Sequence, residues 1–272
     1  MHDTGDRKAP TTALSPGCSP TRRQALSSLA ACASLGLVAC GSYWRPSPVA
    51  MNLLADDRAC TNQAPVLLVL LPGAHMAPEE MQAQGFVEAL RRRNLAVDVV
   101  IAGAGLEYVV DGSFVQRLHQ DVIAPYRAQG YRRIWLAGIS LGGFVAMAYA
   151  LQHPGSIEGI FALAPYLGRR TLQQAVAAAS SPAQWQAQAQ PRGPDDVDHA
   201  VWSWLIAPPA NAPALHLAYG TEDRFAAGHQ MLAQLLQPNR VQTAPGGHDW
   251  PPWVRLWGEW LDRGFLPRQC PP

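Results

Sequence analysis

Three side chains in this sequence are of the types that together turn a hydroxyl group into a nucleophile: Ser140, Asp223 and His248. Ser140 is the centre of a Gly-x-Ser-x-Gly stretch, between an apolar segment expected to form a strand and an Ala-rich segment expected to form a helix. The glycines allow a tight turn that lifts the serine hydroxyl clear of the sheet. The positive end of the helix would stabilise an oxyanion beside it. This context predicts a serine nucleophile.

A serine hydroxyl needs a histidine to accept its proton and a carboxylate to fix the tautomer of that histidine. Asp223 follows a predicted strand and is the expected acid, with its neighbour Glu222 as the alternative. His248 lies in a Gly-rich loop after a short strand and is the expected base. The only lysine of the chain is Lys8, near the N-terminus, so Schiff-base chemistry and a Ser–Lys dyad are excluded from the predicted domain.

These residues must be positioned by elements that alternate along the chain. Apolar segments predict strands at 66–71, 96–102, 134–138, 157–163, 214–219 and 241–243. Helical patterns fall at 79–93, 113–129, 141–153, 226–236 and 252–265. Buried strands alternating with helices predict an α/β fold with a mainly parallel sheet covered on both faces. An Ala/Gln/Pro-rich segment, 168–212, interrupts the alternation with a helix expected at 172–189. It is either a small cap over a pocket or a packed connector.

The order serine, acid, histidine, each in a loop after a strand, resembles the α/β-hydrolase superfamily across nearly all of 64–266. The stretch from Gly246 to Trp253, with an aromatic residue soon after the histidine, looks most like the esterase and mycolyltransferase-like branches. The resemblance implies a serine esterase that acts through an acyl-enzyme on Ser140, without a metal or cofactor. An acyltransferase, a thioesterase or a peptidase would use the same triad, and a non-catalytic binding lipoprotein is the alternative of a different class.

The resemblance also implies an oxyanion hole made of two backbone amides. One is expected from Leu141, directly after the nucleophile, and the other from Ala74, in the loop after the strand at 66–71. His75 in the same loop is a candidate for substrate contact. Trp250 is another candidate, as the first of four tryptophans at helical spacing, although such a stripe is more typical of a helix that buries one face against the sheet.

The N-terminal segment, 1–39, predicts an export signal. Thr21-Arg22-Arg23 resembles a twin-arginine motif, and the apolar stretch after it is shorter than the about 20 residues that span a membrane. The end of this apolar stretch resembles a bacterial lipobox. The resemblance implies lipidation of Cys40 and a cell-envelope location, at the outer membrane or periplasmic face. The alternative is an ordinary secretory signal. Residues 40–63 are then expected to form a tether and 267–272 a C-terminal tail.

Cysteine usage and charge indicate a possible disulfide and limit the expected partners. Cys60 and Cys270 are the cysteines expected outside the leader and the lipid site, and in an oxidising periplasm they would form one disulfide. Two free thiols are the alternative. The formal net charge is +1, without a basic stripe, so no nucleic-acid partner is expected. The expected partners are a small or lipid-like acyl ester and, through Cys40, the membrane. The sequence leaves the oligomeric state open.

Overall fold

The computed structural model describes residues 49–57, 59–103, 108, 112–189, 193 and 196–271. All of them belong to one unit that spans Pro46–Pro272. The predicted export signal, 1–39, and the predicted lipidation site, Cys40, lie outside the described residues. No helix in the described part is both long and apolar enough to cross a membrane.

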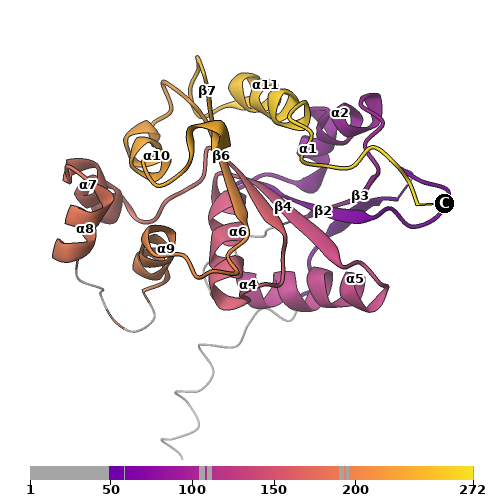
Figure 1. The fold of residues 1–272 in the computed structure, drawn as a ribbon, viewed down its shortest axis with the longest axis horizontal. Helices are drawn as coiled ribbons and strands as arrows, with labels where there is room; N and C mark the ends of the chain where they lie inside the picture. Colours follow the sequence, from indigo (N-terminus) through magenta and orange to yellow (C-terminus); the bar gives the residue numbers. More distant parts are fainter. Residues whose placement is uncertain are drawn as a thin grey trace, which may run out of the picture. The chain divides into compact units, whose positions relative to one another are not determined.

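Seven strands form one sheet in the order β1-β3-β2-β4-β5-β6-β7 (Figure 1). They are β1 (Leu53–Asp56), β2 (Val66–Leu71), β3 (Val97–Ala102), β4 (Arg133–Ile139), β5 (Gly159–Leu163), β6 (Ala214–Gly220) and β7 (Val241–Ala244). Every pairing is parallel except that of β1 with β3. Because β2 and β3 are buried along their whole length, their sequences are continuous apolar runs apart from the buried Asp98. The predicted mainly parallel sheet is confirmed.

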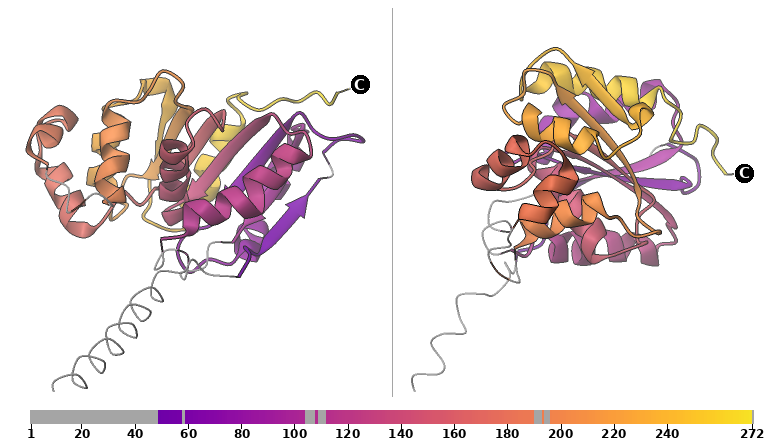
Figure 2. Two further views of the ribbon diagram at one scale, coloured as in Figure 1. Left: turned by 90° about the horizontal axis from the view of Figure 1, so that it is seen from below. Right: turned by 60° about the vertical axis from the view of Figure 1, so that its left-hand side comes forward.

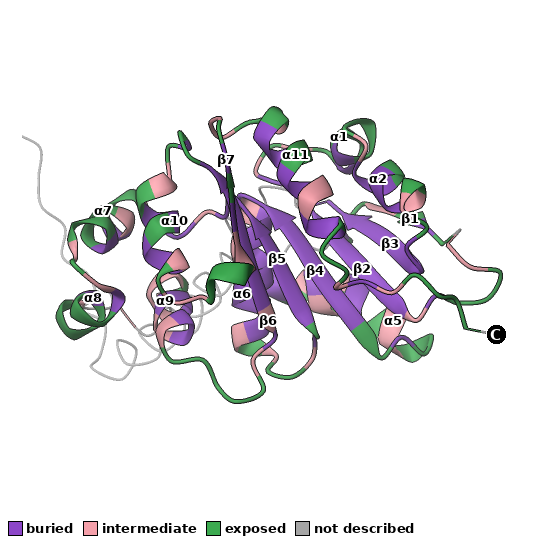
Figure 3. Cartoon of the chain, turned by 45° about the horizontal axis from the view of Figure 1, so that its top comes forward, coloured by how far each residue is buried: buried purple, intermediate pink, exposed green. Residues whose placement is uncertain are grey.

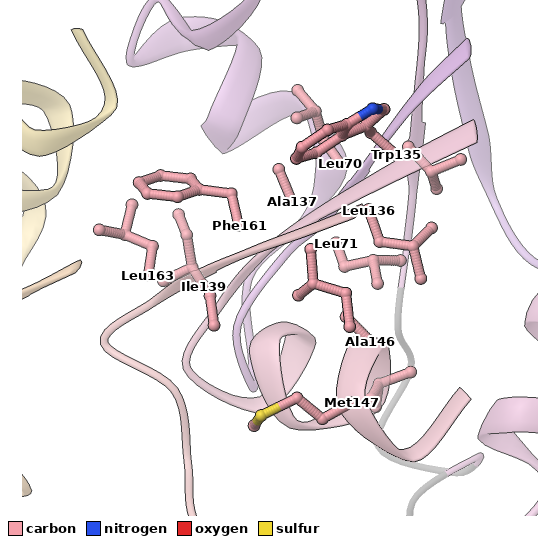
Figure 4. Close-up of a cluster of buried hydrophobic side chains, with 14 of the residues drawn as sticks. Leu70, Leu71, Trp135, Leu136, Ala137, Ile139, Ala146, Met147, Phe161 and Leu163 are labelled. Carbon is pink, nitrogen blue, oxygen red and sulfur yellow. The ribbon is translucent and has the colours of Figure 1, made fainter. Parts of the chain in front are cut away.

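Helices cover both faces of this sheet (Figure 1). One face carries α1 (Pro78–Ala83), α2 (Phe86–Arg92) and α11 (Trp250–Leu261). The other carries α4 (Phe114–Arg117), a π-helical turn (Leu118–Ile123), α5 (Ala124–Ala128) and α6 (Leu141–Gln152). Side chains on β4 alternate between the two layers. Figure 4 shows Trp135 on one side of the strand and Leu136 on the other, the side on which Ala146 and Met147 of α6 lie. On the opposite layer, Trp135 packs against Trp260 of α11, with ring centroids 5.7 Å apart.

The cap segment, defined as residues 168–212, contains α7 (Arg170–Ala178), α8 (Pro182–Gln188) and α9 (Val197–Ile206). α9 packs against α6, and α7 packs against α10 (Ala226–Ala233). α7 and α8 lie beyond α9 and α10, on the β6–β7 side of the sheet (Figure 2). The indole N–H of Trp202 donates to the carbonyl of Leu167 at 2.9 Å, which fixes the start of the segment to α9.

Three helices predicted as continuous are broken. The predicted helix 79–93 is α1 followed by α2, because Gly85 between them adopts a left-handed conformation, φ 80°. The predicted helix 113–129 contains the π-helical turn just before Pro125, which has no N–H to donate. The predicted helix 172–189 is α7 followed by α8, since Pro182 disfavours helical backbone at Ser181.

The predicted tether, 40–63, is wrong over residues 53–56. These residues form β1, which pairs antiparallel with β3 from Leu53 opposite Ala102 to Asp56 opposite Val99. The buried carboxylate of Asp56 also accepts from the Arg91 guanidinium, with Nη2 to Oδ1 at 2.5 Å. The sheet therefore begins before residue 64, the predicted start of the domain. The single short strand lacked a recognisable pattern because its partner lies almost fifty residues away.

The connection between β1 and β2 is joined to the C-terminal segment by a disulfide between Cys60 and Cys270, with an S–S distance of 2.02 Å. The structure thus contains the pairing that the sequence favoured over two free thiols. In the segment that leads to Cys270, the Pro267 carbonyl accepts from Ala96 N at 2.7 Å. The C-terminal residues are consequently held along the edge where β3 begins.

Candidate active site

Ser140 lies on a strained turn between β4 and α6. Its backbone has φ 51° and ψ −112°, a conformation that residues with a side chain rarely adopt. Two hydrogen bonds hold the turn: Ser140 N donates to the Leu163 carbonyl at 2.9 Å, and the Ser140 carbonyl accepts from Tyr166 N at 2.9 Å. The strain is therefore supported by the loop that follows the neighbouring strand, β5.

The glycines beside Ser140 are required by close backbone contacts. A Cβ atom on Gly142 would lie 2.1 Å from the Leu71 carbonyl oxygen, and one on Gly138 would lie 2.2 Å from the Gly142 carbonyl carbon. No real Cβ atom approaches another heavy atom so closely without a shift of the backbone. The Gly-x-Ser-x-Gly pattern thus reflects the approach of α6 to the end of β2 and to its own preceding strand.

The loops after β6 and β7 bring Asp223 and His248 together. Thr221 N donates to the Ala244 carbonyl at 2.8 Å, and Glu222 N donates to the Gly246 carbonyl at 3.0 Å. A Cβ on Gly220 would lie 2.2 Å from the Gly246 oxygen, so the two loops can touch only because Gly220 has no side chain. Since parallel strands end at the same edge of the sheet, both loops also reach the turn at Ser140.

The three predicted residues form a chain of hydrogen bonds. His248 Nε2 lies 3.0 Å from Ser140 Oγ, and His248 Nδ1 lies 2.7 Å from Asp223 Oδ2. The other carboxylate oxygen, Oδ1, accepts from Phe225 N at 2.8 Å. Because an ionised carboxylate can only accept, the proton of the neutral imidazole lies on Nδ1, and Nε2 is free to accept the serine proton. The geometry is that of a serine, histidine and aspartate triad.

The electrostatics of Asp223 suit this arrangement. Burial by itself raises the pKa of the Asp223 carboxyl, but the hydrogen bonds from His248 and from the Phe225 amide outweigh burial, so that this pKa lies below its ordinary value. Asp223 therefore stays ionised at neutral pH. The alternative acid, Glu222, is exposed, and Asp249 is exposed at the start of α11, so the structure selects Asp223 as the partner of His248.

The two amides predicted to hold an oxyanion lie in adjoining segments. Leu141 is the first residue of α6, where helical amides have no intrahelical acceptor. Ala74 is in the loop after β2, and the preceding Leu71 and Pro72 carbonyls face the first turn of α6, as the contacts of a Cβ on Gly142 show. Within the described residues, neither the Leu141 nor the Ala74 amide donates to a protein acceptor. Both are therefore free to bind an oxyanion.

The predicted substrate contacts are placed less directly. His75 is exposed, with a left-handed backbone at φ 62°, and no contact joins it to the triad among the described residues. Trp250 is half-buried, and its ring lies 5.3 Å from that of Trp253, which meets the His248 ring edge-on at 5.0 Å. The Trp253 ring thus contacts both Trp250 and His248, and no ring contact joins Trp250 directly to His248 among the described residues. The other three tryptophans of the stripe, Trp253, Trp257 and Trp260, are buried, as a helix packed on the sheet requires.

Several residues near the triad were not predicted. The Phe225 ring meets the His248 ring edge-on at 5.1 Å and the Tyr166 ring edge-on at 6.4 Å. His229 is fully buried, and its Nε2 lies 2.8 Å from the Pro165 carbonyl, beside Tyr166. Burial lowers the pKa of His229 to about 4, so the ring is neutral and Nε2 is the donor. None of these residues carries a local sequence signal, because each reaches the site through long-range packing.

Two cavities are lined by sequence neighbours of triad residues, Leu141 in one and Arg224 and Phe225 in the other, although neither lining includes a triad residue. The apolar cavity, about 250 Å³, is bordered by α6 along its length from Leu141 to Gln152, by α4 and by the start of α9, and its lining includes Phe144, Val145 and Phe114. The arginine cavity, about 520 Å³, lies between α7 and the segment 224–228. Tyr166 lines both cavities. The described residues contain no group of three or more His, Cys, Asp or Glu side chains arranged to hold a metal ion.

Comparison with known families identifies the class to which this fold and site belong. The family model described as "Putative esterase" matches residues 107–259, more than half of the chain, and the chain belongs to this esterase family. The matched range includes Ser140, Asp223 and His248. The protein is therefore a carboxylic ester hydrolase. No curated protein matches the chain in sequence.

Solved structures show the same α/β-hydrolase fold. The S-formylglutathione hydrolase FrmB from Staphylococcus aureus is 14% identical with a TM-score of 0.53, over 80% of this chain and 97% of that chain. Est1E from Butyrivibrio proteoclasticus is 15% identical with a TM-score of 0.55, over 81% and 95%. FphF, a fluorophosphonate-binding serine hydrolase of Staphylococcus aureus, is 16% identical with a TM-score of 0.52, over 80% and 95%. The predicted α/β-hydrolase fold is confirmed.

Proposed function

We propose that the protein cleaves carboxylic esters through an acyl-enzyme on Ser140. The observation that carries this proposal is the hydrogen-bond chain from Ser140 Oγ to His248 at 3.0 Å and on to Asp223 at 2.7 Å. His248 Nε2 takes the serine proton as Oγ attacks the ester carbonyl carbon, and Asp223 stabilises the imidazolium that forms. The tetrahedral intermediate then collapses, and Nε2–H gives the proton to the leaving alcohol oxygen. Water releases the acyl group by the reverse sequence.

The negative charge of the intermediate falls on the former carbonyl oxygen. The amides of Leu141 and Ala74 are the groups that we assign to it, since both lie beside the turn and have no protein acceptor within the described residues. The N-terminus of α6 adds the positive end of a helix dipole. No step of this reaction requires a metal ion or an organic cofactor.

The nucleophile can be tested by a fluorophosphonate probe on the full-length protein, since the neighbour FphF is described as fluorophosphonate-binding. We expect the probe to label the wild-type protein and a Ser180→Ala variant, and to leave Ser140→Ala unlabelled. Ser180 is the matched control because it is an exposed serine of the cap segment. Labelling of Ser140→Ala, or a wild-type protein that stays unlabelled while folded, would contradict the assignment.

We also propose that the enzyme is exported and anchored to the cell envelope by a lipid on Cys40. The lipobox-like sequence supports this location. The disulfide Cys60–Cys270 supports it independently, because structural disulfides persist in oxidising compartments. Cells grown with an alkyne-tagged fatty acid should yield labelled wild-type protein and labelled Cys32→Ser protein in the membrane fraction. Cys40→Ser protein should be unlabelled. Lipid label that persists on Cys40→Ser would overturn the proposal.

A further inference from the structure

The arginine cavity has an unusual lining for a pocket beside an esterase triad. It is bordered by two guanidinium groups, from Arg170 on α7 and Arg224 just before α10, together with amide groups of Gln173 and Gln174. No Asp or Glu is among its lining residues. The Arg224 guanidinium lies over the Phe225 ring, 4.8 Å from its centroid, which holds it at the mouth of the cavity. The cavity is therefore positively charged.

Most other arginines in the described part of the chain are paired with carboxylates. The carboxylate-paired arginines are Arg91, Arg92, Arg93, Arg117, Arg133, Arg169 and Arg255. Within the same described residues, neither Arg170 nor Arg224 forms an ion pair. A pair of unmatched guanidinium groups beside one cavity favours a ligand that supplies the missing negative charge, since arginine binds carboxylate and phosphate oxygens with two parallel hydrogen bonds.

The arginine cavity is connected to the triad through Phe225. Phe225, which lines the cavity, contacts the His248 ring at 5.1 Å. The leaving oxygen must take its proton from His248 Nε2, so the leaving group has to lie next to this ring. The apolar cavity instead includes Leu141, whose amide binds the acyl oxygen in the proposed mechanism. The two cavities thus correspond to the two halves of an ester.

We propose that the arginine cavity binds an oxyanion, a carboxylate or a phosphate, carried by the alcohol or thiol half of the substrate, while the acyl chain occupies the apolar cavity. This inference rests on the proposed acyl-enzyme mechanism and names its substrate class. The reaction remains a hydrolysis: water is added, the C–O or C–S bond of the ester breaks, and the anionic group leaves unchanged with the alcohol or thiol. Arg170 and Arg224 are the residues that determine this specificity.

The test compares full-length wild-type protein with an Arg170→Gln/Arg224→Gln double variant on four butyryl or succinyl aryl esters. The carboxylate lies on the leaving group in 4-butyryloxybenzoate and is masked in its methyl ester. A phosphate takes its place in 4-butyryloxyphenyl phosphate, and the carboxylate lies on the acyl half in 4-nitrophenyl hemisuccinate. We expect the double variant to lose about tenfold more kcat/KM on the leaving-group anions than on the methyl ester, mainly through KM. The two anionic leaving groups separate carboxylate from phosphate as the preferred group.

Two controls make the result specific to the cavity. Arg132→Gln removes one exposed arginine that has no carboxylate partner among the described residues; it lies just before β4, at the opposite end of the strands from the site, and its loss should leave the preference unchanged. Arg170→Lys/Arg224→Lys keeps the charge but not the paired hydrogen bonds and should restore part of the preference. Salt at about 0.5 M should also reduce the preference, because it screens exposed charges.

The outcomes separate this proposal from the mechanism on which it rests. Equal losses on all four esters would overturn the anion subsite while leaving the esterase mechanism intact. A selective loss on the hemisuccinate would overturn the assignment to the leaving group. If Ser140→Ala retained full hydrolysis of the methyl ester, the proposed mechanism itself would fail, and the subsite would fail with it.

Discussion

The turn that holds Ser140 and the cap segment are built on opposite principles. In the elbow region, defined as residues 138–143, the backbone itself is in contact with its surroundings: a Cβ on Gly138 or Gly142 would collide with backbone atoms at 2.1–2.2 Å. In the cap segment most side chains of α7 and α8 are not buried, and these two helices bury only Leu172, Val176, Pro182 and Trp185 (Figure 3). The first region permits almost no substitution, and the second permits many.

This difference separates the rate of the reaction from the choice of substrate. Residues that position the triad are held by main-chain hydrogen bonds between the loops at the carboxyl edge of the sheet. The cap segment contributes side chains to both cavities, Val197 and Asp198 to the apolar cavity and Arg170 to the arginine cavity. We therefore expect changes near the triad to act on kcat and changes in the cap segment to act on KM and selectivity.

The largest contrast should come from two buried carboxylates, one that belongs to the triad and one in the cap segment. Asp223 holds His248, and Asp196 holds Arg169 of the cap segment at 2.6 Å. Asp223→Asn should lower kcat about 10³- to 10⁴-fold, because an amide no longer fixes the reactive tautomer of His248. Asp196→Asn should change kcat less than about threefold. Steady-state kinetics on one neutral ester measure both. A similar loss of kcat in the two variants would show that the cap segment shapes the chemistry.

The same tryptophan substitution compares how much the helical layer on the sheet and the cap segment contribute to stability. Trp257 is 1% exposed, stacks on Phe86 at 5.2 Å and donates to the Phe86 carbonyl at 3.0 Å. Trp185 is 4% exposed and packs against Trp202 at 5.7 Å. Trp257→Ala should lower the free energy of unfolding by about 3–5 kcal/mol. Trp185→Ala should loosen α8 locally, at a cost of about 1 kcal/mol, and raise KM.

Urea unfolding, followed by tryptophan fluorescence and by circular dichroism, distinguishes these effects. If Trp185→Ala destabilised the protein as much as Trp257→Ala, the cap segment would belong to the same cooperative unit as the sheet. The cap segment and the sheet would then differ in burial but not in stability.

The elbow region was predictable from sequence because its physics is local. An apolar strand, two glycines, a serine and an Ala-rich helix occur in one short run, and backbone contacts leave those residue types few alternatives. Asp223 and His248 were also predictable, since each closely follows a strand and parallel strands end at a common edge. The alternation of strands and helices predicted the sheet for the same reason.

The parts that escaped prediction depend on distant partners. β1 is four residues long and is defined only by its pairing with β3. Phe225 and Tyr166 reach the site through packing between loops, and Arg170 and Arg224 meet only when α7 lies against α10. No periodicity or short sequence motif predicts such long-range contacts. Sequence therefore located the reaction but not the surfaces that would select its substrate.

A methyl group added to a glycine tests how tightly the backbone is packed in the elbow region and in the cap segment. Gly142→Ala places a Cβ against the Leu71 carbonyl and should displace the Leu141 amide, which we expect to lower kcat/KM about 100-fold. Gly193→Ala in the cap segment adds a Cβ that meets no atom within 4 Å and should be close to neutral. Kinetics and thermal unfolding measure both variants. If the Gly142→Ala protein were active and stable, the turn would have room for a Cβ atom that the close Leu71 carbonyl excludes in this structure.

The smallest effect should come from His229, which joins the two regions. Its Nε2–H donates to the Pro165 carbonyl, and the next residue, Tyr166, donates its amide to the Ser140 carbonyl. His229→Ala should lower kcat about tenfold with little change in KM, because the loop that supports the turn loses one buried hydrogen bond. His229→Gln can place an amide N–H near the position of Nε2 and should restore most of kcat. If His229→Ala raised KM without lowering kcat, His229 would act on substrate binding, as we expect of the cap segment, and not on the turn at Ser140.

The pH dependence of stability gives His229 a second, independent readout. Burial lowers its pKa in the folded protein to about 4, whereas the unfolded chain binds a proton near pH 6.5. Between these values the unfolded state holds more protons, so the free energy of unfolding falls as the pH is lowered from 6.5 toward 4. The His229 contribution to this fall should be about 2 kcal/mol between pH 7 and pH 5, and His229→Gln should lack it. If the free energy of unfolding of His229→Gln kept the same pH dependence, His229 would be hydrated and charged in the folded protein. It could then not act as the neutral hydrogen-bond donor to the Pro165 carbonyl.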